Sequence, residues 1–268
     1  MALRSLRWCV ACVVVLAAAP VHAEYEFITN GTFEGGSAPA GLSGALDTLA
    51  DTIPVGWTRY ETFSGGVAEA ALVTPVANNG PSAGGVTAMQ FQRLQGDNAS
   101  GDWTALWQPL NINAANWPGL VLSMDVQVSQ HNLVAGGWVA PAFEWPLVVQ
   151  VNYLDVLNNP QVWRYGWYLA NPGDSPPGPV NDPGSGLIPF YNDRQIPANQ
   201  WVSQTFDLFN ELPQVGTITR IYVGGSGHHY QGLADNISLV AVPEPATVVL
   251  ITMGLAALGV KLRRRAAV

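Results

Sequence analysis

Three aromatic side chains alternate along one stretch of the sequence, where Trp163, Tyr165 and Trp167 are each separated by a single residue. Alternate side chains of an extended strand point to the same face, so the three rings form one row. Sugar rings have apolar C–H faces that stack on tryptophan and tyrosine, which makes the row a candidate carbohydrate-binding platform. Alternatively, the row packs in a core between two sheets. Arg164, on the opposite face, suits a core poorly and favours this second interpretation.

Catalytic chemistry finds little support in the sequence. No Gly-x-Ser-x-Gly nucleophile turn occurs, and both cysteines, Cys9 and Cys12, lie in the first twelve residues. No strand carries the paired acids typical of glycosidases. The adjacent His228 and His229 would point in different directions on a strand and form a poor chelate. We therefore predict that the protein is not an enzyme.

The elements that must position the aromatic row are predicted to be strands. Leu120 to Gln130 alternates apolar and polar residues, as a half-buried strand does. Gly, Pro and Asn clusters separate similar segments, and no convincing amphipathic helix lies between Glu24 and Val242. Two stretches, Gly35 to Thr52 and Asn171 to Pro189, are expected to be long loops. The pattern predicts an all-β protein with a single β-sandwich of the jelly-roll type. The other strand candidates are 25–28, 55–60, 86–92, 103–108, 147–153, 161–169, 201–209, 217–224 and 236–241.

The charge of the central region limits its partners. Between residues 24 and 242, eighteen acidic side chains stand against five arginines and no lysine, a formal balance of −13. Phosphate binding needs clustered Lys and Arg, so nucleic acid is not an expected partner. The same negative field would repel an anionic polysaccharide unless cations bridge the two.

The N-terminus has the pattern of a signal peptide. Arg4 and Arg7 form a basic region, Trp8 to Ala19 is apolar, and small residues stand at positions 21 and 23. This pattern predicts that residues 1–23 are a signal peptide cleaved after Ala23.

The C-terminus has the pattern of a membrane anchor. Residues 246–260 are fifteen uncharged positions, and four basic residues follow between Lys261 and Arg265. A helix of this length would measure about 22 Å, which is short for a bilayer core of about 30 Å. The basic end is expected in the cytoplasm, with the preceding chain outside. We therefore predict a β-sandwich ectodomain over 24–242 and a sorting and anchor segment over 243–265, which contains a transmembrane helix.

The same tail resembles the PEP-CTERM sorting signal of Gram-negative bacteria, which an exosortase recognises. The resemblance implies that an exosortase is a partner and that the protein is held transiently in the inner membrane. It also implies processing near the Pro-Glu-Pro sequence and a final place in the cell envelope or extracellular polysaccharide matrix. The residues that carry the resemblance are Pro243, Glu244, Pro245, Arg263, Arg264 and Arg265.

The two ends of the ectodomain resemble a second family, the carbohydrate-binding jelly rolls related to the galactose-binding fold. Phe27 to Glu34 is similar to the family's opening strand and turn, Gly56-Trp57 to its following Gly-Trp, and Ala234 to Leu239 to its final strand. Such modules often hold a structural calcium between the first and last strands. Glu34 and Asp235 match those positions, so the resemblance implies calcium there. The residue-based alternative is that both acids cap turns through backbone hydrogen bonds.

These observations favour an exported surface or matrix protein that binds carbohydrate without catalysis, with a neutral glycan as the expected ligand. The alternative function is a structural matrix protein or adhesin that makes protein–protein contacts and has no glycan ligand. In that alternative, the aromatic row of Trp163, Tyr165 and Trp167 lies in the core.

Overall fold

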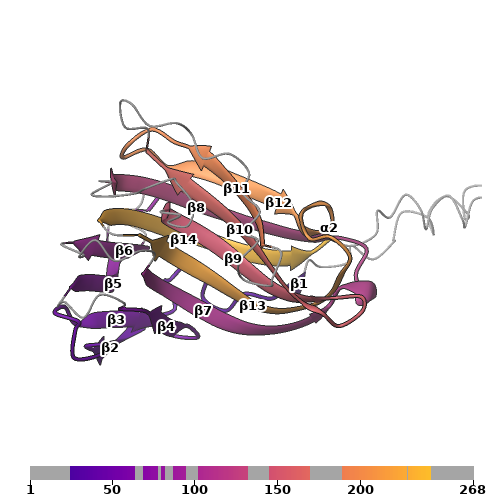
Figure 1. Cartoon of the computed structure of the whole chain (residues 1–268), viewed down its shortest axis with the longest axis horizontal. Coiled ribbons are helices and arrows are strands. Elements are labelled where there is room, and N and C mark those ends of the chain that lie inside the picture. Colours follow the sequence, from indigo (N-terminus) through magenta and orange to yellow (C-terminus); the bar gives the residue numbers. More distant parts are fainter. Residues whose placement is uncertain are drawn as a thin grey trace, which may run out of the picture.

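Two six-stranded sheets and one two-stranded sheet make up almost all of the described structure (Figure 1). The computed structural model describes residues 25–63, 69–77, 80–81, 87–94, 102–131, 145–169, 189–227 and 229–242. The predicted signal peptide, 1–23, and the sorting segment, 243–265, lie outside these residues. Within the described part of the chain, no helix has the length and apolar character needed to cross a membrane.

The first sheet, called sheet I, has the strand order β12-β8-β14-β6-β5, and β1 also pairs with β14. Its order is not sequential because the chain crosses repeatedly to the other layer, as it does in a jelly roll. The strands are β1 (Tyr25–Glu26), β5 (Ala70–Val76), β6 (Ala88–Leu94), β8 (Leu120–His131), β12 (Val202–Asp207) and β14 (Tyr230–Ala241).

The second sheet, sheet II, has the order β11-β10-β9-β13-β7-β4. Its pairs are antiparallel except for β10 and β11, which run parallel. The strands are β4 (Thr58–Glu61), β7 (Trp103–Asn113), β9 (Trp145–Asp155), β10 (Pro160–Tyr168), β11 (Pro189–Gln195) and β13 (Val215–Ser226).

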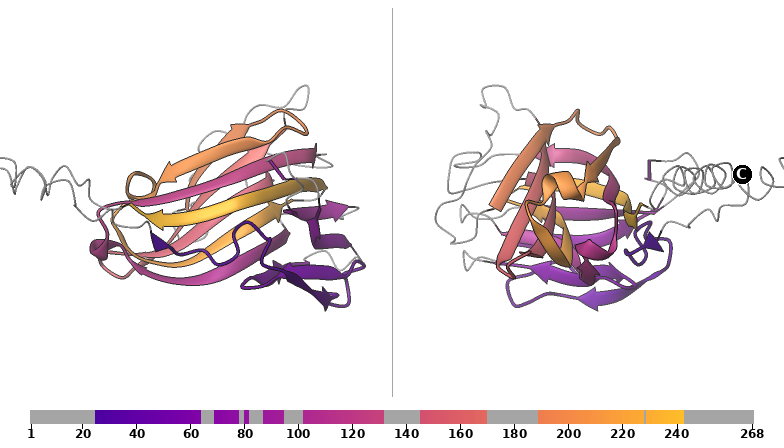
Figure 2. Two further views of the ribbon diagram at one scale, coloured as in Figure 1. Left: turned by 180° about the vertical axis from the view of Figure 1, so that it is seen from behind. Right: turned by 90° about the vertical axis from the view of Figure 1, so that its right-hand side faces the viewer.

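Residues 35–52, expected to be a loop, contain most of a small hairpin. Strands β2 (Ser37–Gly41) and β3 (Asp51–Pro54) pair there, so the loop prediction was wrong for this part. The hairpin lies at one corner of the sandwich, beside β4 and β5 (Figures 1 and 2). Strand β2 is exposed along its length, so its sequence lacks the apolar pattern of a buried strand.

Two short helical turns interrupt the strands. A 3₁₀ turn, η1, spans Ala114–Asn116, and a four-residue helix, α2, spans Leu208–Glu211. The strand expected over 201–209 therefore ends at Asp207, whose side chain accepts a hydrogen bond from Phe209 N at 3.0 Å and caps the helix.

The core lies between the inner faces of the two sheets. The alternation predicted in Leu120 to Gln130 is confirmed, because Leu120, Leu122, Met124 and Val126 are at most 2% exposed. The facing layer of sheet II contributes an equally apolar set from β9 and β13, which pairs with it across the sandwich. The inward residues of that set are Leu147, Val149, Val151, Tyr153, Ile221 and Val223.

The two ends of the described chain meet at the opening turn. Ile237 N donates a hydrogen bond of 2.9 Å to Gly31 O, and Trp57 Nε1 donates one of 3.2 Å to Asn30 O. Asn30 and Asn236 both have positive φ, 53° and 51°, which asparagine tolerates better than most residues. The sequence elements that suggested a common family at the two ends are therefore neighbours in space.

Candidate functional site

The predicted aromatic row lies in the core. Trp163 and Trp167 are 1% and 0% exposed, and Tyr165 is partly buried. All three rings contact Phe206 of β12 across the sandwich. The distance from the Phe206 ring centroid is 5.1 Å for Trp163, 4.8 Å for Tyr165 and 6.3 Å for Trp167. Trp163 Nε1 also donates to Glu211 Oε2 at 3.3 Å. The rings share one face, as expected, but that face is covered and has no room for a sugar ring. The packing supports the core interpretation.

The opposite, outward face of sheet II carries a different set of side chains. The strand register places Thr58, Trp107, Tyr222, Gln150 and Arg164 side by side across β4, β7, β13, β9 and β10. At about 4.8 Å between neighbouring strands, such a row extends roughly 19 Å. This face of the sheet therefore carries one line of aromatic, amide and guanidinium groups, in which Tyr222 and Gln150 are buried and Trp107 and Arg164 are partly exposed.

Aromatic rings form one half of this face. Tyr60 lies 5.4 Å from Tyr222 and 6.4 Å from Trp103, both in edge-on arrangements, and Trp107 lies 6.2 Å from Tyr222. Tyr60 is 38% exposed, whereas Tyr222 is 8% exposed. The contacts between rings restrain Tyr60 while its outer surface remains open to a ligand.

Two arginines are held against the rings. The Arg220 guanidinium lies 4.2 Å from the Trp107 ring centroid, and Arg220 Nη1 donates to the Tyr222 hydroxyl at 2.8 Å. The Arg164 guanidinium lies 5.2 Å from the Trp103 centroid. A guanidinium has five N–H donors, so stacking on a ring leaves donors at its edge in a fixed orientation.

Amide side chains complete the face on β9. Arg164 Nε donates to Gln150 Oε1 at 2.6 Å, and Gln150 Nε2 donates to Asn152 Oδ1 at 2.7 Å. This chain of hydrogen bonds fixes the amides side by side. We call the whole set the outer patch, and it consists of Tyr60, Trp103, Trp107, Gln150, Asn152, Arg164, Arg220 and Tyr222.

The outer patch combines ring surfaces with fixed hydrogen-bond donors and acceptors. Such a surface can hold a ligand that offers apolar C–H faces and hydroxyl groups together, as sugars do. The outer patch was not predicted from the sequence, although the charge of Arg164 indicated which face of its strand points outward. The alternation of Trp103, Ala105 and Trp107 was a second signal, since it puts two tryptophans on one face of β7.

The predicted calcium residues, Glu34 and Asp235, are close enough to interact electrostatically. Burial raises the pKa of Asp235 to about 6; a hydrogen bond from Asn236 N lowers it, and the charges of Asp125 and Glu34 raise it further. Asp235 is 1% exposed, and its Oδ2 accepts no hydrogen bond from the described residues, so this oxygen could serve as a cation ligand. Glu34, however, is exposed and accepts hydrogen bonds from the backbone and hydroxyl of Thr87. Calcium at this pair stays a prediction.

The remaining candidates lie away from the outer patch or outside the described residues. His131, the last residue of β8, is buried, with 7% of its surface exposed. His229 Nε2 lies 2.7 Å from Gln130 Nε2. His228 is outside the described part of the chain. The sorting residues, Pro243 to Pro245 and Arg263 to Arg265, are also outside it.

Comparison with protein families identifies the C-terminal segment. Residues 241–265 match the family described as the PEP-CTERM protein-sorting motif. The identification of the tail from its three-part sequence is therefore confirmed. The motif indicates export and sorting to the cell envelope or surface.

Comparison with solved structures gives distant likenesses. The family 11 carbohydrate-binding module of a cellulosomal cellulase of Clostridium thermocellum is 12% identical, with a TM-score of 0.35, over 78% of this chain and 97% of that one. The TmCBM61 module in complex with β-1,4-galactotriose is 9% identical, with a TM-score of 0.37, over 81% and 99%. A Stig cyclase from Fischerella sp. TAU is 15% identical, with a TM-score of 0.41, over 83% and 100%. No curated protein matches the sequence.

Proposed function

We propose that this protein is an exported surface or matrix protein that binds carbohydrate without catalysis, and that the outer patch is its binding face. The observation that carries the proposal is the register row across five strands of sheet II, which joins Trp107, Tyr222, Gln150 and Arg164. Its length, roughly 19 Å from the strand spacing, suits a chain of several sugar rings rather than a single one.

Each part of the outer patch has a distinct role in the proposed binding. Tyr60 offers the most exposed ring and stacks on the C–H face of a sugar. Arg220 and Arg164 donate to sugar hydroxyls from the edges of guanidinium groups that the rings hold in place. Asn152 adds a partly exposed amide, and a hydrogen bond from the buried Gln150 fixes its orientation.

The charges of the described residues support a hydroxyl-rich ligand. Among the described residues, Arg59 and Arg93 form ion pairs, and their acidic partners include Asp51 and Glu69. Arg220 instead faces rings and a hydroxyl, so its remaining donors can serve a ligand. The net negative charge of residues 24–242 opposes an anionic polysaccharide, and a neutral glycan is therefore the expected ligand.

The sorting tail gives this binding a place to act. We infer that an exosortase processes the chain near Pro243-Glu244-Pro245, after transient anchoring in the inner membrane by the C-terminal helix. The released ectodomain then lies in the envelope or in extracellular polysaccharide, where a glycan-binding face meets abundant ligand.

The proposal is tested by affinity electrophoresis and pull-down of the full chain, purified in mild detergent, on a panel of neutral and acidic polysaccharides. We expect saturable retention on a neutral glycan, weakened at least tenfold by Tyr60→Ala or Arg220→Gln. Tyr25→Ala is the matched control, because Tyr25 is also exposed and stacks on an aromatic ring, Trp117, but belongs to sheet I.

Retention that survives both outer-patch variants unchanged would overturn the assignment of this face. Retention on no polysaccharide, with a folded protein, would favour the alternative of a structural matrix protein or adhesin with protein partners.

A further inference from the structure

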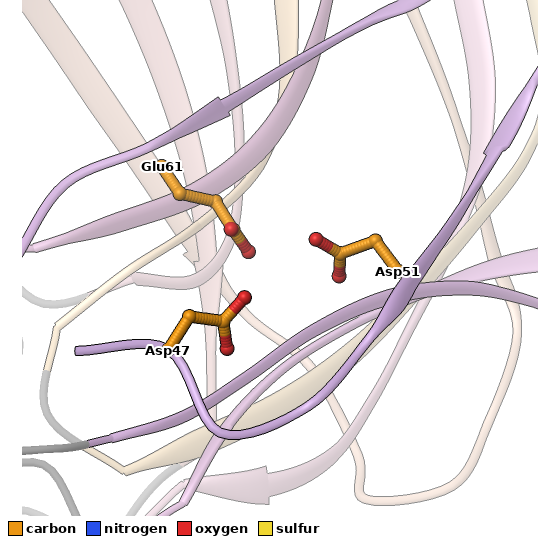
Figure 3. A group of neighbouring side chains, drawn as sticks. All are labelled: Asp47, Asp51 and Glu61. Atoms are coloured by element: carbon orange, nitrogen blue, oxygen red, sulfur yellow. The ribbon is translucent and has the colours of Figure 1, made fainter. Parts of the chain in front are cut away.

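Three carboxylates converge at the corner of the sandwich where the β2–β3 hairpin meets β4 and β5. Asp47 belongs to the loop between β2 and β3, Asp51 begins β3, and Glu61 ends β4. One oxygen from each lies within 4.8 Å of the others, and the three side chains point toward one another (Figure 3). None of these residues belongs to the outer patch or to the Glu34 and Asp235 pair.

Glu61 is the unusual member of this cluster. Its side chain is fully buried, and neither Oε atom accepts a hydrogen bond from the residues that the structure describes. The nearest cationic atom is Arg59 Nε, 4.0 Å from Glu61 Oε2. A buried carboxylate normally accepts several hydrogen bonds, because losing its hydration without compensation costs several kcal/mol. The carboxylate of Glu61 therefore needs a positively charged partner, and it points toward Asp47 and Asp51 (Figure 3).

The positive charge at this corner is insufficient for three ionised acids. Arg59 Nη1 donates to Asp51 Oδ2 at 2.5 Å and to Gly41 O at 2.7 Å, so its charge is directed at one acid and at the hairpin backbone. With Asp47, Asp51 and Glu61 ionised, one arginine leaves a formal charge of −2. Burial raises the pKa of Glu61 to about 7. The nearby Ser43 hydroxyl, which donates to Asp47 Oδ2 at 3.2 Å, and the Arg59 charge lower this pKa, and the charges of Asp51 and Asp47 raise it.

We propose that Asp47, Asp51 and Glu61 bind a hard divalent cation, and that the cation is calcium. Calcium prefers carboxylate and carbonyl oxygens at about 2.3–2.6 Å, so two ligand oxygens on one ion lie up to about 4.6–5.2 Å apart. The 4.8 Å spread of the three oxygens fits that range. Magnesium, at about 2.0–2.1 Å, requires a tighter cluster. A divalent ion also neutralises the excess charge and supplies the partner that Glu61 lacks.

The ion joins segments from both sheets at this corner. Glu61 ends β4 of sheet II, while Asp51 Oδ1 accepts a hydrogen bond from Val73 N of β5, in sheet I, at 2.7 Å. Asp47 accepts from Ser43 N at 2.8 Å and so fixes the loop between the hairpin strands. Calcium therefore fastens the hairpin to the edges of the sandwich, and bound calcium stabilises the folded state by mass action.

The test uses the full chain in mild detergent, stripped with chelator and titrated with calcium by calorimetry and by thermal unfolding. We expect binding in the weak range of extracellular calcium modules, about 10⁻⁴–10⁻³ M, together with a rise in Tm. Glu61→Gln is expected to weaken calcium binding at least tenfold and to remove the Tm rise. In chelator the same variant should be at least as stable as the wild type, because it removes a buried charge.

Asp235→Asn is the matched control, because it neutralises a different buried acid that is also a candidate calcium ligand. It is expected to leave the calcium affinity of the Glu61 site unchanged. The proposal is overturned if Glu61→Gln binds calcium as the wild type does, or if the whole calcium response follows Asp235→Asn. It is also overturned if no binding occurs up to about 10 mM calcium, above the weak limit for such modules.

Discussion

At the scale of single residues, neighbours in one strand have opposite roles. Trp163 and Trp167 fill the space between the sheets, whereas Arg164, between them in the sequence, lies on the outward face beside Gln150. The alternating direction of side chains in a strand separates the two roles without any change of backbone. An aromatic row that resembles a sugar platform in sequence is thus part of the core, and the proposed binding face lies on the other side of the same sheet.

Trp167, in the buried aromatic row of β10, is expected to contribute strongly to stability. Trp167→Ala should lower the free energy of unfolding by about 3–5 kcal/mol, since Trp167 is 0% exposed and its removal leaves a large cavity. Trp107→Ala is the control on the outward face, where partial burial predicts a clearly smaller loss. Both values come from urea denaturation. Equal losses for the two variants would show that the outward ring is as important to stability as the core ring.

At the scale of the elements, the opening turn depends on close contact with the last strand. A Cβ atom at Gly31 would collide with the backbone carbonyl of Ile237, which lies within a register shift in β14. The backbone of β14 is held by pairing with β8 and β6, so it cannot move aside freely.

We therefore expect Gly31→Ala to destabilise the protein by about 1–3 kcal/mol, the usual cost of overpacking. Gly44→Ala is the matched control, because nothing lies within 4 Å of a Cβ at that position. Thermal and urea unfolding measure both variants. If the two glycine variants are equally stable, the contact between the opening turn and β14 does not constrain the fold.

The end of β8 predicts a dependence of stability on pH. Burial lowers the pKa of His131 from its ordinary value of about 6.5 to about 4, while a hydrogen bond with the Leu169 backbone acts in the opposite direction. Between these values the unfolded chain binds more protons than the folded one. The contribution of His131 to stability is therefore complete above about pH 6.5 and is lost as the pH falls toward 4, by about 3 kcal/mol at most.

His131→Gln removes this titration, and the variant should lose less stability than the wild type between pH 6.5 and pH 4. Urea denaturation at several pH values across this interval measures the difference. Parallel pH curves for the two proteins would assign the acid sensitivity to other groups, such as the carboxylates.

At the scale of the whole molecule, the ends of the described chain lie together. Tyr25 pairs with Ala241 where β1 meets β14, at the end of the sandwich opposite the β2–β3 corner (Figure 1). The sorting motif that begins at residue 241 thus starts where β14 finishes. A tail at this end leaves the corner with Asp47, Asp51 and Glu61 at the far end of the domain.

The sorting motif predicts the fate of a tail variant in a host with an exosortase. Replacing Pro243, Glu244 and Pro245 by alanine should block processing, so that the full-length chain accumulates in the inner membrane fraction. Cell fractionation and immunoblotting measure the distribution. The Tyr25→Ala variant, which keeps the Pro-Glu-Pro sequence, is the control. Normal release of the tail variant would contradict exosortase processing at this sequence.

Local sequence patterns determined a large part of this protein. The alternation in Leu120 to Gln130, the three-part tail and the absence of lysine before residue 243 are each contained in neighbouring residues. The all-β sandwich follows from many such segments, because strands with one apolar face must cover that face with a second sheet. The segments β2, β3, β5, β11 and α2 were missed. Strand β2 is exposed along its length and α2 spans four residues, so neither leaves a periodic apolar signal.

Only the tertiary structure decided which surfaces face a ligand. The burial of Trp163 and Trp167 depends on Phe206, about forty residues away on the other sheet. The outer patch depends on the register of five strands. Likewise, Asp47, Asp51 and Glu61 form a cluster only because a hairpin folds back against β4. Sequence spacing specifies the face of a strand on which a side chain stands, but the partner that covers that face, or leaves it open, comes from distant parts of the chain.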